Sequence, residues 1–570
     1  MSAAGIAGGA ALRFQVGVSP AQDGVPEPVP SVSEADGMRI ERNRAVTLSD
    51  GVDVYVDLFR PLTDERVPAL IAWGPYGKHN GGNVYAQFRD DSGRTGGGVR
   101  PEWISSYTTF EGPDPLRWCE AGYAVINVDP RGFWWSGGDF GTVWDRQEAR
   151  DCADVIGWAA AEEWSNGKVG MSGVSYLAVS QWWAASLRPP GLAAINPCEG
   201  LSDVYREFAF HGGIPSDFPS FWQRHRLKYS RSKVEALADM MDDHRLDDAY
   251  WESKRPDLGG IEVPAYVIAS WSDQGLHTRG TIAAFEQLGS QDKYLEVHGR
   301  KKWEYFHAPS TVARQQAFFD RFLKGIDNDV SSWPRVRLEV RRRCYDGVER
   351  RPATWPPPET APRVLHLDVD ALALSGEPPA ADARVSYPAT EDADGVLLRH
   401  RFDRAVDVIG PMRLRLWVEV QDADDMDLFV AIGKLDVDGA EVTLPYANVL
   451  ERGPVALGWL RVSHRALDET RSTSLQPWHA HRTEQPLAPG EMAAADVEIW
   501  PSATRFERGE QLTLRIVPHD PYPDAAMWRH TRLVNAGTHV LHTGPSHPST
   551  LTLGVLSPEP DARTWESPDV

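Results

Sequence analysis

Cysteine is scarce in this chain of 570 residues. The four cysteines, Cys119, Cys152, Cys198 and Cys344, are widely spaced. Their spacing matches neither the paired ligands of a zinc site nor the dense disulfide framework of a small secreted domain. Because Cys152 falls on the apolar stripe of a predicted helix, we expect free and buried thiols.

Long hydrophobic runs and an N-terminal targeting segment are also missing. No run of about 18 apolar residues occurs, so we expect no helix that spans a membrane and no membrane partner. The first residues, Met1 to Gly5, lack the basic region and apolar core of a signal peptide. These absences predict a cytoplasmic protein.

Basic residues are fewer than acidic ones: the chain has 59 Lys and Arg against 81 Asp and Glu, which gives a formal net charge of −22. Such an excess of acid disfavours a nucleic-acid partner. The short basic cluster at residues 300–302 is interpreted as a solvated face or a set of local ion pairs. The composition leaves a homo-oligomer open.

Short apolar segments alternate with helical patterns over residues 38–200. The segments at 67–73, 123–128 and 169–174 are nearly all apolar, as in strands that are covered on both faces. Residues 145–163 carry apolar side chains at helical spacing between two of these strands. Strands that alternate with crossover helices predict an α/β domain with a parallel sheet.

Changes in this pattern suggest the other domain boundaries. Residues 1–37 lack periodicity and are expected to form a loose arm. Residues 201–259 are rich in aromatic and charged side chains and are interpreted as an inserted helical cap, with one helix at 232–243. The sheet pattern resumes over 260–330. From 331 to 570, many short alternating strands predict an all-β sandwich or jelly roll.

The segment from Val169 to Ala178 contains the main candidate for a catalytic residue. An apolar run leads to Gly173 and Ser175 and continues directly into a helical pattern. Strand, tight turn with serine, and helix form a nucleophile elbow, in which the serine hydroxyl is exposed. The usual glycine two residues after the serine is Leu177 here, so a serine that only caps a helix remains an alternative.

Other candidate side chains also follow predicted strands, where ligands collect in a doubly wound sheet. They are Tyr76, Asp273 and His298. The order serine, acid, histidine is that of an α/β-hydrolase triad, in which a neutral imidazole accepts the serine proton and a carboxylate orients the imidazole. A turn aromatic, a helix cap and a structural histidine are the respective alternatives.

Two more histidines compete with His298 for the role of base. His307 lies past the strand end, near the next helix, and stays an alternative. His277 is only four residues beyond Asp273, so its side chain is expected to point along a helix. The His-Ala-His sequence at 479–481 has no accompanying carboxylate or thiol set, and we expect neither a metal nor a cofactor.

Several short segments match motifs of a known protein family. Each match alone is unspecific, but the whole set is specific. The segments are Pro75-Tyr76, Arg131-Gly132, Ser136-Gly137-Gly138, residues 164–170, Gly173-Val174-Ser175-Tyr176, Trp271-Ser272-Asp273, residues 318–325 and residues 458–465. With these segments the chain resembles the cocaine esterase / X-prolyl dipeptidyl-peptidase (S15-like) class of α/β-hydrolase serine hydrolases. The resemblance covers nearly all of the chain beyond residue 40.

The resemblance implies an α/β-hydrolase domain, a helical cap and a C-terminal jelly roll beside the active site. It implies Ser175 as the nucleophile and Asp273 with a histidine as its relay. It also implies that the Tyr76 hydroxyl and the N–H of Tyr176 stabilise the oxyanion. The family motif is Gly-x-Ser-Tyr followed by a later small residue, here Ala178, which accounts for the unusual spacing.

The histidine is the point where the chain departs from the family pattern. Relatives often place it shortly after a Gly-Pro-Trp turn, whereas residues 297–303 read Val-His-Gly-Arg-Lys-Lys-Trp here. On the resemblance, His298 is assigned as the base and His307 as its rival.

These residues support a serine hydrolase that cleaves an ester or amide acyl bond through an acyl-enzyme on Ser175. An X-prolyl dipeptidyl aminopeptidase is the alternative, and it needs an acid to hold the substrate's α-amine. Asp203, Glu207 and Asp217 of the cap are candidates for that acid. A catalytically inactive binding or scaffold protein is the alternative of another class.

Overall fold

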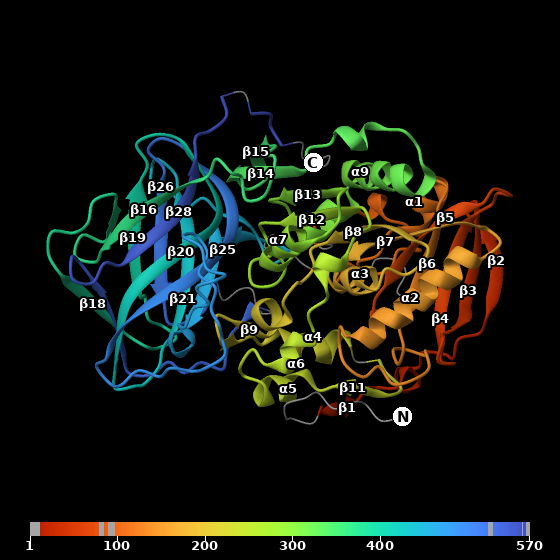
Figure 1. Ribbon diagram of the computed structural model, residues 1–570, viewed down its shortest axis with the longest axis horizontal. Coiled ribbons are helices and arrows are strands. Elements are labelled where there is room, and N and C mark those ends of the chain that lie inside the picture. The colour runs from red at the N-terminus through yellow and green to blue at the C-terminus, as the bar shows by residue number, and fades with distance from the viewer. Residues whose placement is uncertain are drawn as a thin grey trace.

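The chain folds into a mixed sheet with helices on both faces and an all-β region beside it (Figure 1). In Figure 1 the sheet lies on the right and the all-β region, coloured cyan to blue, on the left. This computed structural model describes residues 12–78, 85–88, 97–227, 229–522, 528–560 and 562–565.

The mixed sheet is parallel from β6 to β14 and antiparallel at both ends, in the order β2-β3-β4-β6-β5-β7-β8-β12-β13-β14-β15. Strands β5, β6 and β12 are buried along their whole length, as expected for apolar strands between two helical layers. The bounds of the strands are β2 Ser31–Ala35, β3 Met38–Thr47, β4 Asp53–Pro61, β5 Val67–Trp73, β6 Ala124–Asp129, β7 Ser165–Val174, β8 Leu192–Cys198, β12 Ala265–Ser270, β13 Lys293–His298, β14 Val336–Arg343 and β15 Asp346–Arg350.

The helix that the sequence predicts at 145–163 forms as α2, one of the helices that cover the sheet. Asp145 caps α2 by accepting a hydrogen bond from the backbone N–H of Glu148 at 2.9 Å, and the apolar face of α2 packs on the sheet. The covering helices are α1 Pro115–Glu120, α2 Arg146–Ala161, α3 Tyr176–Ser186, α7 Thr278–Gln287, α8 Lys302–His307 and α9 Pro309–Phe319.

The N-terminal residues differ from the loose arm that composition suggests. Strand β1, Phe14–Val16, pairs with β11, Lys233–Glu235, and β2 pairs with β3. Residues 1–11 lie outside the described residues. Because β11 is drawn into this pairing, the helix expected at 232–243 begins only at Leu237.

The segment interpreted as a cap lies between the sheet and the all-β region (Figure 1). It is less regular than a helical bundle, since a π-helical turn and short strands alternate with its helices. Its elements are the π-turn Tyr205–Ala209, β9 Phe210–His211, β10 Ile214–Pro215, α4 Phe218–Arg226, β11, α5 Leu237–Asp243 and α6 Ala249–Glu252.

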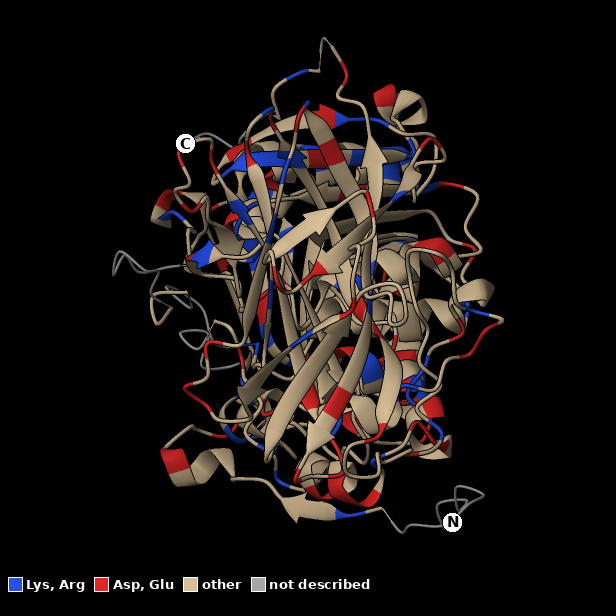
Figure 2. Ribbon diagram, turned by 90° about the vertical axis from the view of Figure 1, so that its left-hand side faces the viewer, with Lys and Arg blue, Asp and Glu red and all other residues tan. Residues whose placement is uncertain are grey.

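The C-terminal part is all-β and encloses a second apolar core. Its two longest strands, β20 and β25, pair in antiparallel fashion. Acidic and basic residues are interspersed over its strands and loops (Figure 2). The strands are β16 Ala361–Asp368, β17 Ala373–Ser375, β18 Ala383–Pro388, β19 Val396–Arg401, β20 Val406–Gln421, β21 Asp427–Leu435, β22 Leu444–Tyr446, β23 Leu450–Gly453, β24 Ala456–Arg461, β25 Met492–Phe506, β26 Gln511–Val517, β27 Thr538–Thr543 and β28 Thr550–Leu556.

Buried polar contacts fix the all-β region against the mixed sheet. Asp407 of β20 accepts from Arg350 of β15 at 3.0 Å and from Arg505 of β25 at 2.7 Å. Arg341 of β14 donates to Ser502 at 2.8 Å. Across the described residues, no helix combines the length and apolar character needed to cross a membrane.

We expect Asp407→Ala to lower the free energy of unfolding by about 3 kcal/mol, because it leaves two arginines at the interface without their buried carboxylate. Urea unfolding followed by fluorescence measures the shift of the midpoint. Asp403→Ala, on the exposed loop before β20, is the matched control and should change the midpoint little. Equal midpoints for both variants would show that the Asp407 contacts do not stabilise the fold.

Candidate active site

Ser175 stands at the junction between strand β7 and helix α3. Its backbone angles, φ 59° and ψ −115°, lie outside the regions that side-chain-bearing residues prefer. Its backbone N–H donates to the carbonyl oxygens of Cys198 at 3.0 Å and Glu199 at 3.1 Å, at the end of β8. These bonds hold the strained turn and present the hydroxyl at the carboxyl edge of the sheet.

Gly173 is the residue that the elbow cannot replace. Its φ is +149°, and a Cβ there would lie 2.6 Å from the Cβ of Leu177 and 3.0 Å from the carbonyl oxygen of Glu111. Leu177 therefore fills the space above Gly173. The residue at the position of the usual second glycine thus packs directly against the first glycine.

His277 is the histidine that the structure brings to Ser175. Its Nε2 lies 3.1 Å from the Ser175 hydroxyl, and its Nδ1 is hydrogen-bonded to the carboxylate of Asp273. Asp273 is completely buried. With Nδ1 donating to this carboxylate, Nε2 can accept the serine proton, which is the arrangement of a serine hydrolase relay.

A tight turn brings His277 back over Asp273. The carbonyl oxygen of Asp273 accepts from the N–H groups of Leu276, His277 and Thr278 at 3.2, 3.1 and 3.3 Å. Gly275 allows this path with a φ of +90°. Since α7 begins only at Thr278, the expectation that His277 points along a helix is wrong.

His298 lies away from the nucleophile, so its assignment as the base needs correction. It ends β13 and is fully buried, with its ring stacked on Tyr305 at a centroid distance of 3.7 Å. Its Nε2 is 3.5 Å from a carboxylate oxygen of Glu199, and its Nδ1 accepts from the N–H of Arg300 at 3.1 Å. Strand order alone placed His298 correctly at the sheet edge but could not show this packing.

The rival His307 is also occupied elsewhere. Its Nε2 lies 2.8 Å from the hydroxyl of Tyr85, and burial lowers its pKa to about 4. Among the described residues, neither His307 nor His298 makes a hydrogen bond to Ser175, whereas His277 does.

The two tyrosines expected at the oxyanion site flank the serine. Tyr76 follows β5, and its hydroxyl accepts from the indole N–H of Trp222 at 3.3 Å and hydrogen-bonds with Ser175. Burial, together with the nearby Glu111, raises the pKa of Tyr76 well above its ordinary value, so the hydroxyl keeps its proton. Tyr176 starts α3, so its N–H has no acceptor within the helix.

Lys302, at the start of α8, is a part of the site that sequence reasoning missed. Its ammonium lies 3.1 Å from the carboxylate of Asp273 and 3.3 Å from Nδ1 of His277. The basic cluster at 300–302 is buried rather than solvated, and each member has an ion pair: Arg300 with Glu339, Lys301 with Glu451 and Lys302 with Asp273. No local motif distinguishes Lys302 from its neighbours.

The charge of Lys302 sets the protonation states of the relay. Burial alone would raise the pKa of Asp273, but Lys302 and His277 outweigh burial and hold this pKa at about 2. Burial and then Lys302 lower the pKa of His277 to about 4. At neutral pH the carboxylate is therefore charged and the imidazole is neutral, as a general base requires.

Glu199 adds a second carboxyl group beneath the relay. It accepts from the Ser270 hydroxyl at 2.9 Å, and burial together with Asp273 raises the pKa of Glu199 well above its ordinary value. Ligand atoms of Glu199, Asp273 and His277 lie within 4.8 Å of one another, close enough to hold a metal ion. The Lys302 ammonium against Asp273 would repel such a cation, so this set suits a proton relay better.

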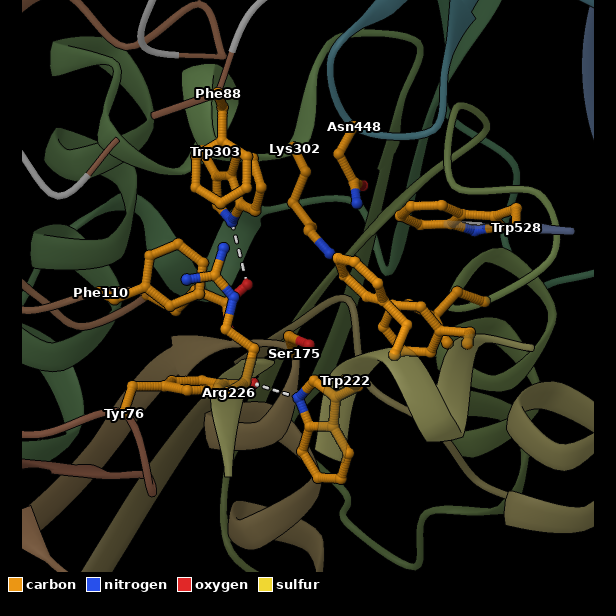
Figure 3. Close-up of a pocket in the computed structure, with 14 residues that line it drawn as sticks. Tyr76, Phe88, Phe110, Ser175, Trp222, Arg226, Lys302, Trp303, Asn448 and Trp528 are labelled. Atoms are coloured by element: carbon orange, nitrogen blue, oxygen red, sulfur yellow. Dashed lines mark hydrogen bonds between the residues drawn. The ribbon is translucent and has the colours of Figure 1, made fainter. Parts of the chain in front are cut away.

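A pocket opens above Ser175 (Figure 3). Its walls are mostly aromatic. The cap contributes one side of the pocket through α4, and the all-β region contributes the turn between β22 and β23. The lining residues are Tyr76, Phe88, Phe110, Glu111, Ser175, Phe218, Phe221, Trp222, Arg226, Leu276, Lys302, Trp303, Asn448 and Trp528.

Family comparisons agree with this architecture. Residues 50–301 match the model of the X-Pro dipeptidyl-peptidase (S15 family), and residues 328–552 match that of the X-Pro dipeptidyl-peptidase C-terminal non-catalytic domain. The resemblance inferred from the sequence motifs is confirmed.

Individual relatives extend the agreement over the whole chain. A crystal structure of a CocE/NonD family hydrolase from Staphylococcus aureus is 36% identical, covers 95% of this chain and 99% of its own, and superposes with a TM-score of 0.87. The cocaine esterase of Rhodococcus sp. (strain MB1 Bresler) is 28% identical over 63% of this chain and 67% of its own length. A putative Xaa-Pro dipeptidyl-peptidase of Bacillus anthracis is 23% identical over 62% of this chain and 63% of its own. With both parts matched and one solved relative similar throughout, this chain belongs to the CocE/NonD family of S15-type serine hydrolases.

Proposed function

We propose that this protein hydrolyses an ester or amide acyl bond through an acyl-enzyme on Ser175, with His277 as the base and Asp273 as the residue that orients it. The observation that carries the proposal is the 3.1 Å contact between the Ser175 hydroxyl and Nε2 of His277, made at a strained strand-to-helix turn. Strain of this kind persists where the surrounding structure enforces it, and it concentrates at functional sites.

The geometry supports a two-stage reaction. His277 accepts the hydroxyl proton as Ser175 attacks the acyl carbon, and it then donates that proton to the leaving group. The Tyr76 hydroxyl and the Tyr176 N–H stabilise the tetrahedral oxyanion. In the second stage, water attacks the acyl carbon of the acyl-enzyme, and His277 again accepts the proton of the attacking group. Asp273 stabilises the imidazolium at each stage.

We further infer that the catalytic part has an α/β-hydrolase fold, formed by residues 38–200 and 260–330. Residues 201–259 act as its cap. Strands β14 and β15 extend the mixed sheet, so we assign the jelly roll to the strands from β16 onward rather than to the whole of 331–570. The strand order, the antiparallel β4 next to β6, and the elbow after β7 support this assignment. The cap and the jelly roll then close the pocket from two sides.

The aminopeptidase alternative is less well supported, because the acids considered for it are already bound. Asp203 is paired with Arg206 and Arg255, and Glu207 is paired with Arg279. Asp217 accepts a hydrogen bond from the Thr531 hydroxyl at 3.0 Å. None of the three acids lines the pocket above Ser175. A protein without catalytic activity is also disfavoured, since the complete relay is assembled.

For the base, we expect His277→Ala to lower kcat for a p-nitrophenyl ester by about 10⁴-fold or more, because nothing else accepts the Ser175 proton. His298→Ala is the matched comparison, and it should lose far less activity once its folding is verified by circular dichroism. Ester hydrolysis measured by absorbance gives both values. Full activity in His277→Ala together with loss in His298→Ala would overturn this assignment.

For the oxyanion donor, Tyr76→Phe should lower kcat by about 10²- to 10³-fold, since one preorganised hydrogen bond to the developing charge is lost. The Michaelis constant should change little. Tyr107→Phe removes a hydroxyl that binds Asp36 away from the pocket and serves as the control. If both variants kept the parental kcat, Tyr76 would have no part in the reaction.

The pH profile tests the role of Lys302. A lowered His277 pKa keeps the base unprotonated in mild acid, so kcat/KM should fall only as the pH approaches about 4. Lys302→Met removes the cation beside the imidazole, which favours its protonated form, so the acidic limb should move to higher pH. Lys301→Met, whose ammonium pairs with Glu451, should leave that limb in place. Coincident acidic limbs in all three proteins would contradict the role of Lys302.

A further inference from the structure

The pocket above Ser175 has a charge pattern that the proposed reaction does not use. Three ionisable side chains of its lining lie outside the relay or at its edge: Glu111, Arg226 and Lys302. Figure 3 shows Arg226 and Lys302 beside the space above the serine, and Lys302 reaches down into it. The charge of Lys302 is balanced by Asp273, so the other two decide which charge a substrate meets.

Arg226 brings a guanidinium to the pocket from the end of α4. The guanidinium carbon lies 5.2 Å from the ring centre of Phe88 and 5.1 Å from that of Phe110. Within the part of the chain that the structure describes, no carboxylate makes an ion pair with it. A guanidinium held on aromatic faces keeps its forked donors available for a planar anion.

Glu111 balances Arg226 only in part. One of its carboxyl oxygens accepts from the indole N–H of Trp303 at 2.9 Å, and the other has no hydrogen-bond partner among the described residues. Burial raises the pKa of Glu111 to about 7, against the opposing effects of Lys302 and Arg226. Near neutral pH a substantial share of this carboxyl is therefore uncharged, and its protonated form can donate to an anion.

The all-β region adds a second unused polar group. Asn448, on the turn between β22 and β23, is buried against the pocket, and its amide oxygen has no partner among the described residues. The backbone N–H of the preceding Ala447 donates to the carbonyl oxygen of Ser272 at 2.9 Å, which fixes this turn beside the relay. A polar substituent that enters the pocket therefore finds both a cation and an amide.

We propose that the pocket selects ester or amide substrates that carry a carboxylate, held by Arg226, and disfavours substrates with a free α-amine. This inference rests on the proposed acyl hydrolysis. A substrate ammonium would meet the like charge of Arg226 in a pocket of low polarity, where repulsion is strong. A carboxylate would instead make charge-assisted hydrogen bonds with the guanidinium while its apolar body packs on the aromatic walls.

Two matched ester series test the proposal and locate the carboxylate. The acyl series consists of p-nitrophenyl 3-phenylpropanoates with a para carboxylate, carboxamide or aminomethyl group. The leaving-group series consists of phenylacetate esters of 4-hydroxybenzoate, 4-hydroxybenzamide and 4-hydroxybenzylamine. In at least one series, we expect kcat/KM of the carboxylate ester to exceed that of the carboxamide ester by about 10-fold or more. The ammonium ester should be the poorest substrate.

The variant Arg226→Leu should bring this carboxylate-to-carboxamide ratio close to one, and Arg226→Lys should restore part of it. Arg224→Leu, on the exposed side of the same helix, is the matched control and should keep the parental ratio. Using the ratio within each variant separates selectivity from a general loss of activity.

Inhibition of the unchanged protein gives an independent measurement should Arg226→Leu fail to fold. We expect 3-phenylpropanoate to inhibit at least about 10-fold more strongly than 3-phenylpropanamide and 3-phenylpropylamine. Equal rates and inhibition for all three charge types, or a preference for the ammonium compounds, would overturn the selectivity. Failure to hydrolyse any ester of either series would instead overturn the proposed function itself.

Discussion

The hydrogen bond between Asp273 and His277 is the interaction on which the candidate active site depends. It is closed within a single turn, in which the N–H groups of Leu276, His277 and Thr278 donate to the carbonyl oxygen of Asp273. The acid and the base therefore come from one short segment at the end of β12. Their relative position needs no long-range packing, and only Ser175 must be brought to them by the sheet.

The strand order of the sheet brings Ser175 next to Asp273 and His277. Strands β7, β8 and β12 are neighbours and parallel, so their carboxyl ends meet at one edge. Ser175 follows β7 and Asp273 follows β12, while Glu199 follows β8 between them. Lys302 then reaches the same edge from the start of α8. Its ammonium keeps Asp273 charged and His277 neutral in a site from which water is largely excluded.

The sequence was sufficient to place Ser175 and Asp273 at the sheet edge, but not to identify the histidine that contacts Ser175. Ser175 could be found because an elbow has a local signature, and Asp273 because a strand end is visible in the apolar pattern. His277 was misjudged, since a spacing of four suggests a helix face, whereas Gly275 diverts the chain into a turn. That glycine, between an acid and a histidine, was the available signal. Lys302 and Arg226 carried no such signal, because only tertiary packing distinguishes a buried cation from a solvated one.

The cap and the all-β region both line the pocket above Ser175. Each lends side chains to the pocket, Arg226 from α4 and Asn448 from the turn between β22 and β23. Neither segment takes part in the relay, and both share the pocket walls with side chains of the mixed-sheet part such as Glu111 and Trp303. Relatives of this chain bear names as different as cocaine esterase and Xaa-Pro dipeptidyl-peptidase.

The central claim is that His277 activates Ser175, and covalent labelling tests it most directly. The protein would be treated with a fluorophosphonate, digested, and its peptides identified by mass spectrometry. The account predicts phosphonylation of Ser175 in the unchanged protein and in His298→Ala, and strongly slowed labelling in His277→Ala. Labelling of another serine, or rapid labelling of Ser175 without His277, would contradict it.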